Sequence, residues 1–262
     1  MKHEIQNKYA YLGNNRAVTM TYFGRRLILD TRNIQNYSII THGFYEKGVA
    51  WAIEKYLKPG DTMIDVGANI GFFTLLGNHI VGPKGKVYSL EPNPDIFELM
   101  KSSVHINAFR PRSIPLNMVA FNKADTLELT WSAAKHGGGR LRTTDKIKLD
   151  EKSAKVKTEK LDNLINAEDL PVNLIKIDTE GSELYALQGA RTIFEKSKDC
   201  VVITEWNPNF LRGRGSSVQE AIEFISKRFS IIEKIVKVGE VLTLRPEQLK
   251  NISHCNLILR NP

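Results

Sequence analysis

The residues best suited to chemistry follow two apolar segments that read as neighbouring strands. The segment DVGANIGFFT, residues 65–74, places Gly67 and Gly71 between the first apolar run and an expected helix. Gly67 can adopt a positive φ without a Cβ penalty, and Gly71 lets the helix approach the sheet and a ligand closely. Glu91 ends the next strand, roughly 20 residues further on, where a carboxylate can accept both hydroxyls of a ribose. Together these features predict a nucleoside-cofactor site.

The glycine spacing distinguishes between two classes of nucleoside cofactor. Dinucleotide-binding loops carry Gly-x-Gly-x-x-Gly, whereas this loop reads Gly67-x-x-x-Gly71. Asp65 at the end of the strand is poorly placed for a pyrophosphate, but a carboxylate suits a cationic ligand. S-adenosylmethionine carries a sulfonium and an α-ammonium group, so the sequence favours S-adenosylmethionine over NAD.

A second group of polar residues follows two later strands. Asp178 and Glu180 follow NLIKI, and Glu205 and Asn207 end or follow CVVIT. Carboxylates at a ligand site can take up a proton as general bases, so Asp178, Glu180 and Glu205 are candidate catalytic residues. Asp178, Glu205 and Asn207 together offer the oxygen ligands that Mg²⁺ prefers. His42 and His136 remain alternative bases.

The elements that must position these residues alternate between strand and helix. We expect strands at 62–66, 86–91, 115–120, 126–131, 173–178, 200–206, 229–236 and 254–260. We expect helices that begin near 71, 94, 158, 182 and 216, of which the fourth spans 182–196. This alternation predicts an α/β, Rossmann-like fold with a mostly parallel sheet and helices on both faces. Ligands of such sheets bind beyond the carboxyl ends of the strands.

The first part of the chain has a different pattern. Residues 16–30 alternate around a central glycine and predict a hairpin or meander, and residues 45–58 have helical spacing. Pro59-Gly60 ends that helix. We therefore expect an N-terminal β/α extension at 1–58 and a cofactor-binding domain at 59–262.

The charge distribution indicates which partners are possible, and the cysteines and the hydropathy indicate the cellular location. The net charge is +8, and residues 135–160 hold nine basic and four acidic residues, so most of the excess lies in one stretch. This stretch is either a solvated loop or a contact for an anionic acceptor. Cys200 and Cys255 form no Cys-x-x-Cys pair, so a disulfide framework is not expected. The absence of an apolar leader or a transmembrane-length run predicts a cytoplasmic location.

Four segments carry a resemblance to a known family: GDTMIDVGANIGFFT (60–74), VYSLEPNP (87–94), LIKIDTEGSE (174–183) and VVITEW (201–206). They resemble class I S-adenosylmethionine-dependent methyltransferases, specifically the FkbM family. The resemblance implies a seven-stranded sheet with an antiparallel last strand, and methyl transfer to a hydroxyl of a sugar, a glycan or a natural product. It also implies cofactor contacts at Asp65, Gly67, Ala68, Asn69, Gly71, Thr74, Glu91, Pro92, Asn117, Ala120 and Asp178.

Two other functions remain open. The basic charge suits an RNA methyltransferase, but adenine amino-methyltransferases carry Asn/Asp-Pro-Pro-aromatic where this chain reads DTEG at 178–181. The basic stretch of this chain at 135–160 also holds few of the aromatic residues that stack on bases. A non-catalytic scaffold that keeps a methyltransferase fold is the other alternative.

Overall fold

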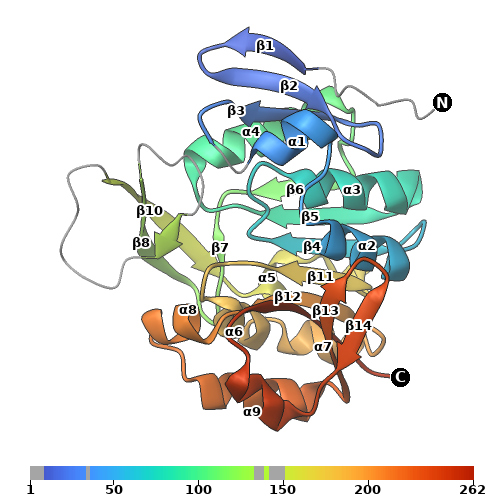
Figure 1. Ribbon diagram of the computed structural model, residues 1–262, viewed down its shortest axis with the longest axis vertical. Helices are drawn as coiled ribbons and strands as arrows, with labels where there is room; N and C mark the ends of the chain where they lie inside the picture. Colours follow the sequence, from blue (N-terminus) through green and yellow to red (C-terminus); the bar gives the residue numbers. More distant parts are fainter. Residues whose placement is uncertain (1–8, 34–35, 133–138, 142–150) are drawn as a thin grey trace.

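One central sheet forms the core of the chain, because the side chains of its short apolar strands are buried on both faces. The computed structural model describes residues 9–33, 36–132, 139–141 and 151–262. The sheet has eight strands in the order β14-β13-β15-β12-β11-β4-β5-β6 (Figure 1). Their bounds are β4 (Thr62–Val66), β5 (Lys86–Leu90), β6 (Ser113–Leu116), β11 (Leu174–Ile177), β12 (Val201–Trp206), β13 (Ile231–Lys237), β14 (Glu240–Thr243) and β15 (Cys255–Arg260).

Strand direction agrees with the expected fold. From β6 to β12 all neighbours are parallel, and β15 pairs antiparallel with both β12 and β13. The mostly parallel α/β sheet and its antiparallel last strand are thus confirmed. β14 is an additional eighth strand that forms a hairpin with β13. Its four residues form a largely exposed edge, so they lack the apolar run by which the other strands were predicted.

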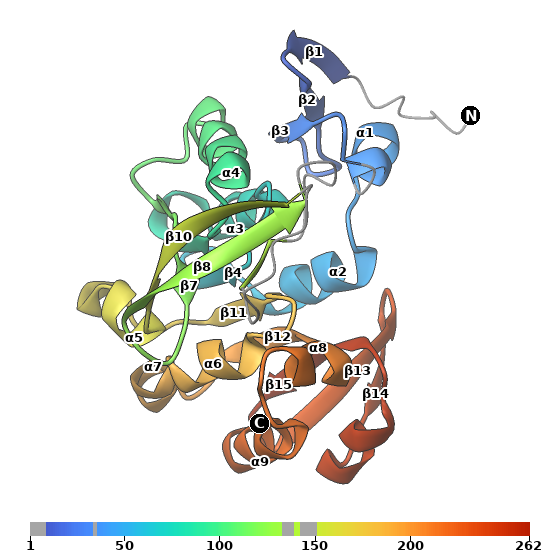
Figure 2. The same cartoon turned by 90° about the vertical axis from the view of Figure 1, so that its left-hand side faces the viewer.

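Helices cover both faces of the sheet, as Figure 2 shows. One face carries α2 (Lys47–Tyr56), α3 (Phe72–Val81) and α4 (Pro94–Ile106), and the other carries α5 (Leu161–Leu164), α6 (Glu183–Gln188), α7 (Arg191–Lys196) and α9 (Val218–Arg228). Side chains alternate along each strand. Met63 therefore packs with the first group of helices, and Ile64 packs with the second.

The helix expected at 182–196 is interrupted, which corrects the prediction of one continuous element. α6 ends at Gln188, and α7 begins at Arg191. A Cβ on Gly189 would lie 2.2 Å from the carbonyl oxygen of Phe121, so this glycine permits a close backbone approach. Asp162 then accepts the N–H groups of Thr192 and Ile193 at 3.0 and 2.9 Å, which caps the second helix.

Two smaller sheets extend from this core. The N-terminal sheet contains β1 (Tyr9–Gly13), β2 (Arg16–Met20) and β3 (Arg26–Asp30), and α1 (Tyr37–His42) follows it. The hairpin expected at 16–30 is confirmed, with β1 as a third strand. This sheet lies beside α4 at the top of Figure 1. The proposed boundary between residues 58 and 59 stays a prediction.

The other small sheet contains β7 (Val119–Ala120), β8 (Asp125–Ser132), β9 (Arg140–Leu141) and β10 (Glu151–Glu159). The expected strand at 126–131 is confirmed. The helix expected from residue 158 begins only at Leu161, because β10 extends through Glu159. β10 alternates exposed lysines with the buried Val156 and Thr158, so its pattern is that of a strand rather than a solvated loop.

The remaining helices are short: α8 (Pro208–Gly213) and the 3₁₀ segments Gly82–Lys84, Ala167–Asp169 and Pro246–Asn251. Both cysteines are buried free thiols. Of the helices in the part of the chain that the structure describes, none combines the length and apolar character needed to cross a membrane.

Replacing Gly67 should destabilise the fold strongly. Gly67 has φ +71°, and a Cβ there would lie 1.8 Å from the carbonyl oxygen of Asp178. We expect Gly67→Ala to cost more than about 3 kcal/mol in the free energy of unfolding, measured by denaturant titration. Gly24→Ala is the matched control, since Gly24 has φ +76° with nothing within 4 Å of its Cβ position. It should cost only about 1 kcal/mol. Equal losses in the two variants would contradict the clash.

Candidate active site

A cavity of about 340 Å³ opens beyond the carboxyl ends of the central strands. Its size is that of a small-molecule site. The predicted site residues that line it are Gly67, Ala68, Asn69, Glu91, Pro92, Ala120, Asp178, Glu180 and Glu205. Ala120 belongs to β7, and the other residues end or follow β4, β5, β11 and β12, separated by up to 138 positions in sequence. Parallel pairing of these four strands brings their carboxyl ends to one edge of the sheet.

Five other predicted residues lie next to the cavity without lining it. Asp65 and Thr74 are fully buried, and the Thr74 hydroxyl donates to Asp65 Oδ2 at 2.7 Å. Gly71 begins α3, where a Cβ would lie 2.8 Å from Met100 Cγ. Asn117 Nδ2 donates to the carbonyl of Glu91 at 2.9 Å and so supports the adjacent wall. Asn207 caps α8 by accepting two backbone N–H groups.

The glycine loop and Glu91 are joined directly. The N–H of Asn69, at φ +51°, donates to Glu91 Oε2 at 2.8 Å, and the N–H of Asn93 donates to Oε1 at 2.8 Å. Burial raises the pKa of Glu91 to about 7, although these two N–H groups oppose the shift. The same carboxylate therefore fixes the loop and faces the cavity.

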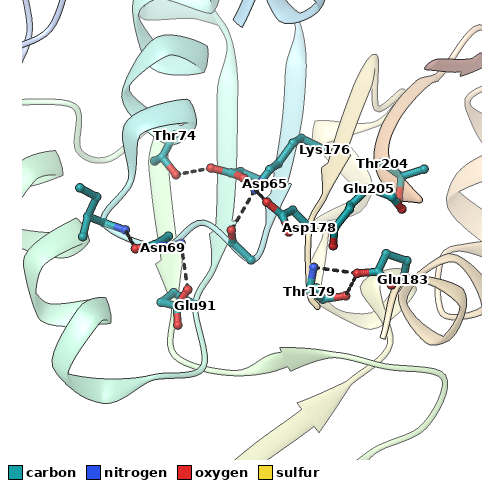
Figure 3. A network of polar contacts seen from close by, with 12 residues as sticks. Asp65, Asn69, Thr74, Glu91, Lys176, Asp178, Thr179, Glu183, Thr204 and Glu205 are labelled. Atoms are coloured by element: carbon teal, nitrogen blue, oxygen red, sulfur yellow. Dashed lines mark hydrogen bonds and ion pairs between the residues drawn. The ribbon is translucent and has the colours of Figure 1, made fainter. Parts of the chain in front are cut away.

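A buried ion pair lies beneath the loop (Figure 3). Register places Lys176 of β11 opposite Asp65 of β4, and alternation directs both toward α3. Lys176 Nζ donates to the Gly67 carbonyl at 2.9 Å and lies 3.4 Å from Asp65 Oδ1 and 4.0 Å from Asp178 Oδ2. Burial lowers the pKa of Lys176, but the carboxylates of Asp65, Asp178 and Glu46 outweigh burial and raise it above its usual value.

The other end of the cavity is acidic. Glu205 Oε1 lies 2.9 Å from His254 Nε2, while Glu205 Oε2 is buried and has no hydrogen-bond partner among the described residues. Burial, followed by repulsion from Asp178 and other nearby carboxylates, raises the pKa of Glu205 to about 8. Burial and Asp178 also raise the pKa of Glu46. In Figure 3, Glu205 and Glu91 lie at opposite sides of the network.

The turn after β11 holds the remaining candidate, Glu180. Its backbone has φ +53°, and Gly181 has φ +111°. Glu183 Oε1 accepts hydrogen bonds from the N–H of Thr179, the Thr179 hydroxyl and the N–H of Gly181, at 2.9–3.0 Å. Glu183 therefore fastens the turn, while Glu180 lines the cavity.

The predicted magnesium ligands do not form a three-ligand set. Asp178 and Glu205 line the cavity, but Asn207 Oδ1 accepts the N–H groups of Asn209 and Phe210. Among the described residues, no group of three or more His, Cys, Asp or Glu side chains is arranged to hold a metal. These residues do not fit the magnesium site, so we derive no step through it.

Sequence reasoning missed several residues of this site. Lys176, Glu46 and His254 line the cavity, and none of them was among the candidates. A lysine within the apolar run LIKI was the available signal for Lys176. His254 precedes β15, which runs antiparallel to β12 and so begins beside the carboxyl end of that strand. The alternative base His42 is exposed and outside the cavity wall, and His136 lies outside the described residues.

The cavity's chemistry suits a cationic nucleoside cofactor. Glu91 lies where a ribose is bound in Rossmann-like folds, and further carboxylates line the cavity toward β11 and β12. The strand order, the glycine turn after β4 and the carboxylate after β5 define the fold as that of class I S-adenosylmethionine-dependent methyltransferases.

Comparison with known proteins identifies the family. The Methyltransferase FkbM domain matches residues 65–231, well over half of the chain, and the chain belongs to this family. It is therefore an S-adenosylmethionine-dependent methyltransferase.

Individual relatives are distant. Methyltransferase sdnD of Sordaria araneosa is 25% identical over 178 residues, which cover 57% of this chain and 68% of that protein. Hexuronic acid methyltransferase AglP of Haloferax volcanii is 31% identical over 147 residues, which cover 55% of this chain and only 56% of that protein. The structure of P. horikoshii TYW2 in complex with MeSAdo is 16% identical, with a TM-score of 0.45, over 95% of this chain and 72% of that chain. This structural likeness is too distant to bear on function.

Glu91 should make stability depend on pH. Folding raises its pKa from 4.5 to about 7, so its protonated form favours the folded state. Its contribution is complete below about pH 4.5 and is lost as pH rises toward 7. We expect the free energy of unfolding of Glu91→Gln to fall less over this window than that of wild type, by on the order of 3 kcal/mol. Glu98→Gln, at an exposed position on α4, should follow wild type. Parallel curves for wild type and Glu91→Gln would refute the shift.

Proposed function

We propose that this methyltransferase acts on a hydroxyl oxygen of a sugar, a glycan or a natural product. The observation that carries the proposal is the Glu205 carboxylate at the end of the cavity away from Glu91, whose buried Oε2 has no hydrogen-bond partner in the described part of the chain. A hydroxyl group must lose a proton as it becomes a nucleophile, and a carboxylate with a raised pKa is a suitable base near neutral pH.

The residues have separate tasks in this reaction. Glu91 would accept hydrogen bonds from the cofactor ribose, and Asp178 and the 67–69 loop would hold its methionine part. The cofactor supplies an activated methyl group on a sulfonium, so the protein chiefly aligns the two reactants. Glu205 would take the acceptor's hydroxyl proton, and His254, bonded to Glu205 and largely exposed, would pass that proton to water.

The acceptor end of the cavity favours an uncharged hydroxyl compound. Glu46, Glu180 and Glu205 line it, so a carboxylate or phosphate on the acceptor would meet like charge when Glu205 is ionised to act as a base. Carboxylates and the nearby Tyr45 and Phe210 rings suit a sugar, which offers many hydroxyl donors and an apolar face. The distant relative AglP, by its name, acts on a hexuronic acid, which supports a sugar but differs in charge. An anionic acceptor held by residues 135–160 stays a prediction, since 133–138 and 142–150 lie outside the described residues.

The ribose assignment predicts a specific binding loss. We expect Glu91→Ala to weaken S-adenosylmethionine binding by roughly 1–3 kcal/mol, because charge-assisted hydrogen bonds are lost. Isothermal titration calorimetry measures this directly, with NAD as the negative control ligand. Glu98→Ala, on the exposed side of α4, should bind as wild type does. Unchanged affinity in Glu91→Ala would sink the ribose assignment.

The base assignment predicts a pH profile. Glu205 acts as a base only when ionised, so methyl transfer should speed up as pH rises through about 8. Glu205→Gln should lose this rise and at least about 100-fold in kcat, with little change in cofactor affinity. The assay follows release of S-adenosylhomocysteine with uncharged sugar glycosides, uronic acids, phenolic natural products and RNA. NMR then locates the methyl group.

Glu223→Gln, at an exposed position of α9, is the control for Glu205→Gln. Methylation of a nitrogen, or of RNA alone, would overturn the proposed acceptor class. An unchanged pH profile in Glu205→Gln would instead move the base to another residue.

A further inference from the structure

Lys176 is a cation buried in a site that receives a cation. The side chain is 5% exposed, and the residue lines the same cavity as Gly67 and Asp178. Its Nζ lies 5.4 Å from the centre of the Phe73 ring, which covers it on the α3 side. A methyltransferase that only had to attract S-adenosylmethionine would gain nothing from a positive charge at this place. The position of Lys176 and the residues that it contacts therefore need another explanation.

The neighbours of Lys176 show what the charge does. Asp65 is fully buried, and its Oδ1 accepts no hydrogen bond within the described part of the chain, so Lys176 at 3.4 Å is its counter-ion. Asp178 and Glu46 add negative charge around the same ammonium. Without Lys176, the negative charge of these carboxylates would not be neutralised. Charge interactions are strong in such buried surroundings, so the cavity would become more negative.

Charge changes at this site during the reaction. The bound cofactor carries a sulfonium, while the product S-adenosylhomocysteine carries a neutral thioether. Uncompensated carboxylates would therefore stabilise the cofactor's ground state more than the transition state, in which the positive charge on sulfur is decreasing. Catalysis requires the opposite preference, since only binding that is stronger in the transition state accelerates transfer.

We propose that Lys176 is an internal counter-cation that sets how strongly the site prefers the sulfonium cofactor over its thioether product. Its hydrogen bond to the Gly67 carbonyl places the ammonium at the methionine end, and its pairing with Asp65 keeps it charged there. Lys176 is a positioning residue, because it acts through Asp65, Gly67 and Asp178 and not on the reacting atoms. The inference rests on the binding of S-adenosylmethionine in this cavity.

The test compares two ligands that differ by one methyl group and one charge. Calorimetry gives Kd for S-adenosylmethionine and for S-adenosylhomocysteine, and the readout is the ratio of product Kd to cofactor Kd. Lys176→Met keeps an unbranched side chain without the charge and should raise this ratio roughly tenfold. Asp65→Asn leaves Lys176 without its main counter-charge and should lower the ratio. The double variant Asp65→Asn/Lys176→Met should return it toward wild type.

Controls separate this inference from a purely structural role. Lys86→Met removes another strand lysine, which pairs with Asp169 at 3.8 Å away from the cavity, and should leave the ratio unchanged. If Lys176→Met does not fold, the ratio should still fall in Asp65→Asn and return toward wild type in the double variant. Equal weakening of both ligands in every variant would overturn the inference, because Lys176 would then only shape the loop. Failure of the wild type to bind either ligand would instead refute cofactor binding in this cavity.

Discussion

The buried pairing of Asp65 with Lys176 is the constraint on which the site depends. It joins the two central strands β4 and β11 on the α3 face, and its third member is the Gly67 carbonyl. A buried charge is costly unless it is paired and hydrogen-bonded, so loss of either partner alone would be strongly destabilising. The Thr74 hydroxyl donates to the other oxygen of Asp65, Oδ2, and ties the first turn of α3 to the same point.

The two ends of the cavity are built from different parts of the sheet. The nucleoside end depends on Glu91, whose carboxylate receives the N–H groups of the loop and of the turn that begins α4. The end proposed for the acceptor holds Glu205 and His254, and the antiparallel β15 brings His254 to the same edge. Asp178 lies between the two ends, where it faces Lys176 on one side and the acidic group on the other. The proposed roles therefore place cofactor binding and proton removal at opposite ends of the cavity.

Local sequence patterns predicted the elements that leave a direct signal in the sequence. The loop at 65–74, Glu91 and the parallel strands were accessible because glycine spacing and apolar runs report them directly. β14 was not, since its exposed edge lacks an apolar run, and neither were β10 and the interruption at Gly189, since each depends on a partner distant in sequence. Lys176 and His254 were missed for the same reason: a buried lysine is recognised only when its counter-ion is known, and a histidine before a last strand only when strand direction is known.

A crystal structure of the protein with bound S-adenosylhomocysteine would test the central claim, that this one cavity holds the cofactor with its methionine end above the Asp65–Lys176 pair. We predict the ribose hydroxyls on the Glu91 carboxylate, and the homocysteine part against Gly67 and Asp178, with its sulfur facing the Glu205 end. A ligand bound with its ribose away from Glu91, or in another part of the molecule, would contradict the account.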